Sequence, residues 1–408
     1  MKHVTLKLSG ILIITILSIT CNKRIYDISV DPVCSVNPTE DLPKGVDKYK
    51  LSNVKLLTTD GGRVDWSSCG KWIIYDSERE PEIYEVWRIK PDGSEKECLT
   101  CDHPDLPEGT TRGQPAWHPD GKWFVFQCEK EMHMGNMHSN PGHGIFHDLW
   151  IMNIETRKCY LLNEVRNGMN GEKPGGTLHA VFSNKGDKLL WTDLQDHGYS
   201  RLKFKNGLFG DWQIALADFY VDTLGIPHIK NRVSFNPGKD LNWFETHQFG
   251  PDDTWFIYSG NTLDQWELYS DINCNTIEQL KNYCEPVRLT KTSGKNKEKG
   301  YYDEIAHFTP NYDAFIWMSK EGKKVEYWMA NPDGSCRRQI THFNTPGYKE
   351  YELIKGKYKS NVPADNAWNP NPSAGKQQLV AYVNIDFVPL KAIGRINYIY
   401  ILEFDYAE

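Results

Sequence analysis

Short apolar segments alternate with polar turns along most of the chain. In each repeat an aromatic residue comes first, a short polar turn that often contains glycine follows, and an apolar strand comes next. Six segments follow this pattern: "DWSSCGKWIIY" from Asp65, "AWHPDGKWFVF" from Ala116, "VFSNKGDKLLW" from Val181, "QFGPDDTWFIY" from Gln248, "HFTPNYDAFIW" from His307 and "AWNPNPSAGKQQLVAY" from Ala367. We call the aromatic residue near the start of each copy its anchor; the six anchors are Trp66, Trp117, Phe182, Phe249, Phe308 and Trp368.

A third strand, and in several copies a fourth, follows each of these strand pairs. Third strands include "DLWIMNIETR" and "EYWMANPDGS", and fourth strands end in Leu-Thr or Ile-Thr, as at Leu99-Thr100 and Ile340-Thr341. Pro-Asp-Gly and similar turns join the strands, and no helical periodicity of useful length is present. Four short antiparallel strands per repeat predict the blade of a β-propeller.

One segment has the ending of a fourth strand but precedes the first repeat. It is Lys55–Thr58, and the sixth repeat has no closing Leu-Thr strand of its own. We therefore expect this segment to complete blade six and to close the ring, which removes the open sheet edges. The predicted fold is an all-β, six-bladed propeller over residues 46–408, with seven blades as the alternative.

The repeats resemble those of the TolB-type propeller family. The resemblance covers about residues 50–408 and is specific in "AWHPDGKWFVF" and "EYWMANPDGS", whereas the "NPSAG" turn of blade six departs from the pattern. TolB-type propellers are interaction platforms. The resemblance therefore implies a non-catalytic envelope protein that binds a protein or a glycan.

The N-terminus is typical of an export signal. Lys2 and Lys7 precede the apolar run Leu8–Thr20, which is shorter than the roughly twenty residues of a membrane span. The run ends at Cys21, which resembles the lipobox cysteine of bacterial lipoproteins. We expect a signal peptide over residues 1–20, a tether over 21–45 and a lipid anchor in the outer membrane at Cys21, facing the periplasm or the cell surface. Plain secretion with an incidental cysteine is the alternative.

Export permits disulfides, and charge narrows the class of partner. We expect Cys274 to pair with Cys284 and Cys128 with Cys159, while Cys98 and Cys101 form a single CxxC that is weak evidence for zinc. The net charge is −7 and the basic residues are scattered, which excludes a nucleic-acid surface. We expect a monomer.

The longer connections all fall on one face of the predicted propeller. They are the connections after second strands and between blades, at roughly 128–147, 194–211, 220–244, 291–304 and 344–364. The connections after first and third strands are short, and we call the face that carries them the short-turn face. Loops longer than a scaffold needs indicate a binding surface. The first of them contains "MHMGNMHSNPGHGIFH", a candidate lid whose His138 or His143 could reach the channel.

Polar residues just before the anchors form the candidate site. They are Arg63, Asp65, Gln114, His179, Glu245, His247, Glu304, His307, Asp365 and Asn366. Inner strands begin beside the central channel, so these residues should surround its mouth on the face of the long connections. Alternate side chains of a strand point to opposite sides, so they can all face the channel only if the strand entries kink. Ordinary polar lining of a solvated channel is the alternative.

The combination of three histidines and a glutamine in a propeller channel resembles the metal site of the oligogalacturonate lyases. Some ulvan lyases are also propellers, and they use His, Tyr and Arg. The resemblance implies a channel metal, held by His and Gln, that binds a uronate carboxylate while a base removes the C5 proton. The candidate ligands of a divalent Mn, Ca or Zn ion are then His179, His247, His307 and Gln114, and any of the histidines could instead be the base. The other candidates are Tyr199 or Tyr302 as proton donors, Arg63 or Arg201 for a substrate carboxylate or sulfate, and Glu304 and His143 as substrate contacts. Trp243 or Trp266 could stack on sugar rings, with burial inside a blade as the alternative for each.

These observations predict an exported carbohydrate-active enzyme that performs β-elimination on uronate-containing oligosaccharides. Chain cleavage by a lyase and loss of water by a dehydratase use the same chemistry, and the residues do not separate them. The non-catalytic envelope lipoprotein remains the alternative.

Overall fold

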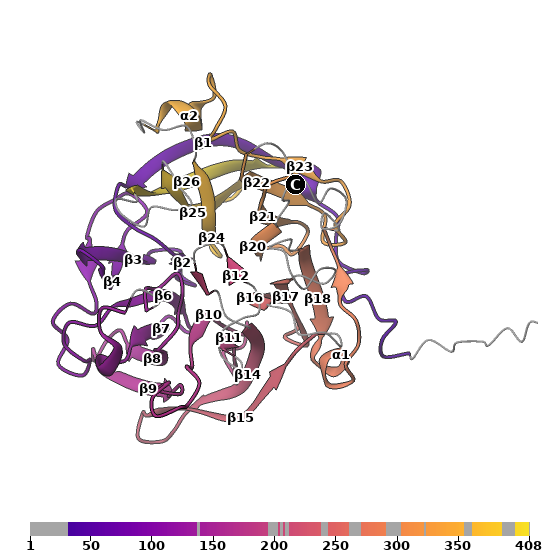
Figure 1. Cartoon of the computed structure of the whole chain (residues 1–408). Helices are drawn as coiled ribbons and strands as arrows, with labels where there is room; N and C mark the ends of the chain where they lie inside the picture. Colours follow the sequence, from indigo (N-terminus) through magenta and orange to yellow (C-terminus); the bar gives the residue numbers. More distant parts are fainter. Residues whose placement is uncertain are drawn as a thin grey trace, which may run out of the picture.

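Six four-stranded antiparallel sheets are arranged in a ring around a central channel in the computed structural model (Figure 1). The structure describes residues 32–136, 139–194, 203–204, 207–208, 212–237, 244–260, 271–290, 303–321, 324–354, 361–385 and 396–407. The ring confirms the predicted all-β fold and settles the number of blades at six.

The first three blades follow one another along the chain, each starting at the channel. Blade one comprises β2 (Val64–Trp66), β3 (Ile73–Glu80), β4 (Ile83–Ile89) and β5 (Glu97–Cys98). Blade two comprises β6 (Arg112–Trp117), β7 (Trp123–Glu129), β8 (His147–Asn153) and β9 (Cys159–Asn163). Blade three comprises β10 (Thr177–Phe182), β11 (Lys188–Leu194), β14 (Trp212–Val221) and β15 (Pro227–Phe235).

The last three blades repeat this arrangement. Blade four comprises β16 (Phe244–Phe249), β17 (Trp255–Gly260), β18 (Asp271–Thr276) and β19 (Val287–Arg288). Blade five comprises β20 (Asp303–Phe308), β21 (Phe315–Ser319), β22 (Glu326–Ala330) and β23 (Arg338–Gln339). Blade six comprises β24 (Val362–Trp368), β25 (Lys376–Ile385), β26 (Ile396–Tyr406) and β1 (Tyr49–Thr58). The remaining elements are η1 (Val46–Lys48), η2 (Glu131–His133), α1 (Ile277–Lys281), α2 (Lys349–Glu352) and the hairpin of β12 (Lys203–Phe204) with β13 (Gly207–Leu208).

The N-terminal strand β1 closes the ring, as predicted. It pairs antiparallel with β26 from Tyr49, opposite Tyr406, to Thr58, opposite Ile399. The strand is longer than the predicted Lys55–Thr58 because Tyr49 is fully buried beside Phe404 and donates its hydroxyl to Asp313 Oδ1 at 2.6 Å.

The anchors form the walls between blades. All six anchor side chains are buried, and each packs between its own blade and the preceding one. Trp117 of β6, for example, lies in one apolar cluster with Ile74 of blade one and Phe124 of blade two. Burial of one large aromatic side chain at every blade junction explains why the anchor recurs in the sequence.

The cysteine pairing differs from our expectation. Cys284 pairs with Cys34 and not with Cys274, and Cys98 pairs with Cys101. Cys274, Cys128 and Cys159 are buried free thiols. The predicted pairs were wrong because closeness in sequence or in one sheet does not bring two sulfur atoms together. The Cys98–Cys101 disulfide also leaves that CxxC without thiolates for zinc.

Two predicted segments also need correction. The connection expected over 220–244 contains the fourth strand β15, which is nine residues long. We expected the third strand of blade four at "WELYSDI" from Trp266; in the described part of the chain this strand covers Asp271–Thr276. Among the described residues, no helix is long and apolar enough to cross a membrane.

Candidate functional site

Every inner strand of blades two to six is kinked just before its anchor. The strand register shifts between Gly113 and Ala116 in β6, and corresponding shifts occur in β10, β16, β20 and β24. Gln114, His179 and Ile305 adopt positive φ angles of 50°, 48° and 52° at these points. These bulges are the kinks that the site prediction required, since a bulge redirects the side chains around it.

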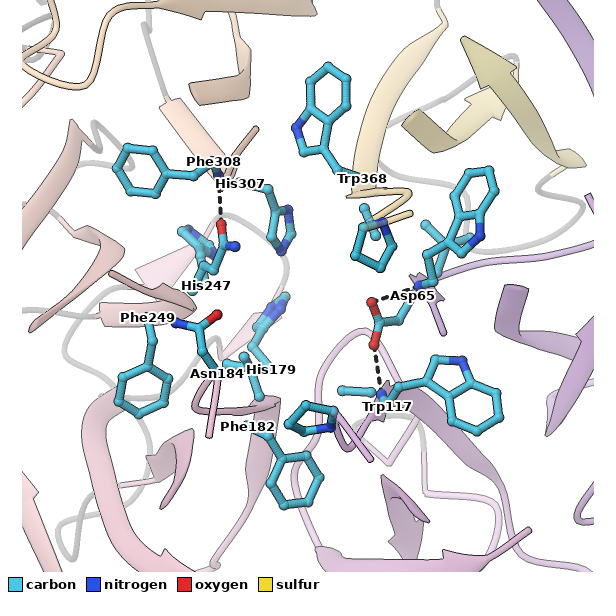
Figure 2. A pocket seen from close by; sticks show the side chains of 18 of the residues that line it. Asp65, Trp117, His179, Phe182, Asn184, His247, Phe249, His307, Phe308 and Trp368 are labelled. Atoms are coloured by element: carbon cyan, nitrogen blue, oxygen red, sulfur yellow. Dashed lines mark hydrogen bonds between the residues drawn. The ribbon is translucent and has the colours of Figure 1, made fainter. Parts of the chain in front are cut away.

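A cavity of about 340 Å³ occupies the channel. Figure 2 shows His179 and His307 pointing into the cavity, while His247 lies at its wall. The lining includes Arg63, Asp65, Gln114, His179, His247, His307 and Asp365 but not Glu245, Glu304 or Asn366. The cavity extends past the anchors to the turns that join the first and second strands of the blades, where it is lined by Ser68, Pro119, Asn184, Pro310 and Pro370. The cavity therefore extends toward the short-turn face, whereas we expected the site at the opposite face.

Several of the predicted site residues tie neighbouring blades together. The Asp65 carboxylate of blade one accepts hydrogen bonds from the backbone N–H of Trp66 at 2.7 Å and, across the blade junction, of Trp117 at 2.6 Å (Figure 2). Gln114 of blade two accepts from the N–H of His179 at 2.7 Å and donates to the carbonyl of Pro141 at 2.6 Å. We call such a hydrogen bond between the inner strands of adjacent blades a latch.

Latches continue around the ring. Gln248 of blade four accepts from the N–H of Phe308 at 2.6 Å, and Asp365 of blade six accepts from the N–H of Val64 at 3.1 Å. Between blades three and four, the Thr246 hydroxyl donates to the carbonyl of His179 at 2.8 Å. A latch supplies a partner for a buried polar backbone group at each junction.

His247 belongs to this structural set. Its Nε2 accepts from the backbone N–H of Ile305 at 3.2 Å and lies 2.5 Å from the Ser259 hydroxyl. Burial, reinforced by His179, His307 and Arg63, holds the pKa of His247 well below its ordinary value. It is therefore a neutral imidazole at pH 7 whose Nε2 is already occupied.

His179 instead faces a carboxylate. Its Nε2 lies 3.4 Å from Oε2 of Glu245, and its ring meets that of His247 edge-on at 6.1 Å between centroids. Burial raises the pKa of Glu245, but His179 and Arg63 more than offset this and hold the pKa below its ordinary value. Glu245 is therefore an ionised partner for His179.

His307 has a weaker contact. Its Nδ1 lies 3.3 Å from Oδ1 of Asn366, whose amide donates to the carbonyl of Ile305 at 3.1 Å. Burial lowers the pKa of His307, although nearby Asp365 opposes the shift. At neutral pH this imidazole is also uncharged.

Arg63 is the cation of the channel. Its backbone N–H donates to Asp76 Oδ1 at 3.0 Å, but in the described part of the chain its half-buried guanidinium has no hydrogen-bonded or ion-paired partner. Its charge acts at longer range, where it lowers the pKa of Asp76, Glu245 and Glu304.

Two carboxyl groups beside the channel are poorly ionised. Burial, followed by the charge of Glu245, raises the pKa of Glu304 to about 8, so this side chain is mostly protonated at neutral pH. Burial raises the pKa of Asp65 to about 7 although two backbone N–H groups stabilise its charge. The negative charge of the channel is therefore smaller than its carboxyl groups imply.

The predicted metal ligands do not form a ligand set. Within the described ranges, no group of three or more His, Cys, Asp or Glu side chains is arranged to hold a metal ion. Gln114 and Nε2 of His247 already serve latches. A metal in this channel therefore remains a prediction from residue types.

The remaining candidates divide into two groups. His143 hydrogen-bonds through Nδ1 with the Asn140 amide at 3.0 Å and is not part of the cavity lining. Seven others fall outside the described residues: Cys21, His138, Tyr199, Arg201, Trp243, Trp266 and Tyr302.

Asp76 is a site residue that we did not predict. Its carboxylate receives the N–H groups of Arg63 and Gln114, at 3.0 and 2.8 Å, and so fixes two strand entries. A Cβ atom at Gly62 would collide with this carboxylate, so the position needs glycine. One feature of the sequence could have identified Asp76: it is a charged residue directly after the apolar run Ile73–Tyr75 of a buried strand.

No model of a known protein family and no curated protein matches the chain. Similar solved structures include TolB from Acinetobacter baumannii, with 13% identity over 84% of this chain and 66% of that protein and a TM-score of 0.46. A putative TolB from Agrobacterium tumefaciens has 16% identity over 72% of this chain and 76% of that protein, with a TM-score of 0.43. The β-propeller domain of the Trilobed protease from Pyrococcus furiosus has 9% identity over 88% and 96% of the two chains, with a TM-score of 0.40. The propeller is established by the six sheets of this chain, and likeness at this level carries no argument about function.

Proposed function

We propose that the central channel binds an acidic carbohydrate, of the class that carries a uronate carboxylate. The observation that supports this proposal is Arg63, a half-buried residue of the cavity lining whose guanidinium has no partner among the described residues. A partly buried charge gains most from an opposite charge with matching geometry, and guanidinium binds a carboxylate through two parallel hydrogen bonds.

The rest of the lining suits the hydroxyl groups of a sugar. His247 and His307 are uncharged, and a neutral imidazole can donate or accept a hydrogen bond. Asp365 adds an acceptor for hydroxyl hydrogens. A cavity of about 340 Å³ falls at the small end of the range of ligand sites, about 300–1,000 Å³. These features favour a short oligosaccharide or the end of a longer one.

Calorimetric titration of uronate oligosaccharides into the full chain tests this function. We expect Arg63→Ala to weaken binding by 10-fold or more, on the order of the 1.5–3 kcal/mol of a charge-assisted hydrogen bond. Arg79→Ala is the matched control, because Arg79 pairs with exposed Asp102 and does not line the cavity. The same glycans with their carboxyl groups reduced should bind weakly to all three proteins. Equal affinity of the wild type and Arg63→Ala would reject the proposal.

We also propose that the protein acts at the cell envelope, anchored by a lipid on Cys21. The support is the sequence of the N-terminus, in which the apolar run Leu8–Thr20 ends at that cysteine. Mass spectrometry of the mature protein tests the anchor: a diacylglyceryl group on Cys21 is expected, and an unmodified Cys21 would contradict it.

A second candidate function is β-elimination, and the His179–Glu245 pair favours it. An ionised carboxylate beside an imidazole holds the orientation of the ring, as a general base requires. With the substrate carboxylate bound to Arg63, His179 would take the C5 proton and the C4–O bond would break as the C4=C5 double bond forms. The leaving oxygen would take a proton from the protonated His179 or from water, because Glu304, although protonated at neutral pH, does not line the cavity. The product is an unsaturated uronate, whether the leaving group is a sugar or water.

Ultraviolet absorbance of the unsaturated product separates the two functions. If the protein is an enzyme, His179→Gln should remove the absorbance increase while binding in the calorimeter persists. His228→Gln is the matched control, because His228 pairs with Asp222 on blade three away from the channel. Binding without any absorbance increase over a broad panel of uronate glycans would leave the non-catalytic function.

A further inference from the structure

The segment before β1 crosses the short-turn face of the propeller. We call Pro32–Lys48 the strap. The carbonyl of Val36 accepts from the Gln279 amide of α1 at 2.7 Å, and Cys34 is disulfide-bonded to Cys284 in blade four. Farther along, the N–H of Gly45 donates to the carbonyl of Asp313 in blade five at 2.8 Å. The strap therefore passes from blade four over blade five before it enters blade six as β1.

The disulfide fixes where the N-terminal region meets the propeller. Cys21 lies eleven positions before Pro32, a distance of at most about 36–40 Å in a fully extended chain. Because the strap is held at blade four, this distance is measured from the short-turn face and not from the opposite one. A membrane anchor at Cys21 would therefore keep this face within reach of the bilayer.

Apolar side chains are exposed on the same face. Tyr283, adjacent to the disulfide, is 71% exposed, and Val36 of the strap is 47% exposed. In blade three, β14 extends beyond β11 and forms with β15 an overhanging hairpin, whose turn carries Leu224 at 82% exposure. Phe219 holds this hairpin in place, since its ring packs against His118 and Phe182. Exposed Leu and Tyr side chains on well-held turns are typical of contacts with a membrane interface.

We propose that the short-turn face contacts a lipid bilayer through Tyr283, Val36 and Leu224, and that the Cys34–Cys284 disulfide sets this orientation. The inference rests on the proposed lipid anchor at Cys21. It does not depend on the ligand of the channel. The bilayer is favoured over a protein partner because the chain that leads to Cys21 arrives beside Tyr283. A consequence is that the channel cavity, which extends toward this face, is turned toward the membrane.

Hydrogen–deuterium exchange of the full lipidated chain in phosphatidylethanolamine–phosphatidylglycerol vesicles tests the orientation. The reference is Cys21→Ser protein mixed with the same vesicles. We expect peptides that cover residues 220–226 and 281–285 to exchange severalfold more slowly in the lipidated protein. Peptides over 131–136 and 168–172, on the opposite face, should be unchanged although Met132 and Met169 are 56% and 50% exposed.

Variants sharpen the test. Leu224→Ser and Tyr283→Ser should each reduce the protection of their own segment, whereas Met132→Ser and Met169→Ser should have no effect. Cys34→Ser should reduce the difference between the two faces, because the strap is then held by non-covalent contacts alone. Equal protection of both faces, or none, in protein whose lipidation is verified by mass spectrometry would overturn the orientation. An unmodified Cys21 would overturn it together with the anchor, while ligand binding by calorimetry would be unaffected in either case.

Discussion

Arg63, Asp65 and Gln114 all precede an anchor, yet the structure uses them differently. Asp65 and Gln114 bind backbone N–H groups of the next blade, and only Arg63 offers the cavity a charge without a partner among the described residues. Their residue types and positions could be predicted from the repeat. Their hydrogen-bond partners could not, since these lie one blade away and depend on the bulge at each strand entry.

Glu304 provides a test of the channel electrostatics at the level of one residue. Its folded-state pKa of about 8 exceeds the ordinary 4.5, so the folded protein binds the proton more tightly than the unfolded chain does. This contribution to stability is complete below about pH 4.5 and is lost as the pH rises through 8. Between pH 5 and pH 9, the free energy of unfolding should therefore fall less steeply in Glu304→Gln than in the wild type.

An isolated group would contribute about 1.4 kcal/mol for every unit by which its pKa changes on folding. We expect the two curves to differ by less than that sum, on the order of 1 kcal/mol across this range, because Glu304 interacts with Glu245. Denaturant unfolding at a series of pH values measures the difference. Parallel curves would show that Glu304 is ionised in the folded protein.

The latches act between elements. Gln248 of β16 accepts the N–H of Phe308 in β20, and removing this acceptor leaves a buried N–H without a partner. We expect Gln248→Leu to lower the free energy of unfolding by about 1–3 kcal/mol. Gln378→Leu is the control, since its partner is the amide of Asn369 within blade six. If thermal unfolding shows that the two variants lose equal stability, a latch between blades contributes no more than a hydrogen bond within one blade.

The strap provides a second test between elements. Its disulfide joins residues 250 positions apart and ties the start of the closing strand to blade four. Cys34→Ser should lower the free energy of unfolding by about 2–4 kcal/mol, and a reducing agent should destabilise the wild type equally. Cys69→Ser, which removes an exposed free thiol, should have no effect. A reducing agent that destabilises the Cys34→Ser variant just as much would place the effect in the other disulfide.

At the scale of the whole molecule, the ring follows from the repeat, while its site depends on how the blades meet. Six anchors and one strand without a blade predicted six blades and their closure, because these signals lie within single strands. The Cys34–Cys284 disulfide was not predictable, because a strap over two blades has no local sequence pattern. Likewise the cavity extends toward the short-turn face, since the bulges turn the histidines inward and the anchors line the space beyond them.

The central claim is that a uronate binds in this channel through Arg63. The most direct measurement is a crystal structure of the full chain soaked with a uronate disaccharide at saturating concentration. We predict that its carboxylate lies within hydrogen-bond distance of the Arg63 guanidinium, with sugar hydroxyls near His179 and His307. A disaccharide bound only on the outside of the blades, or an unoccupied channel at saturation, would contradict the claim.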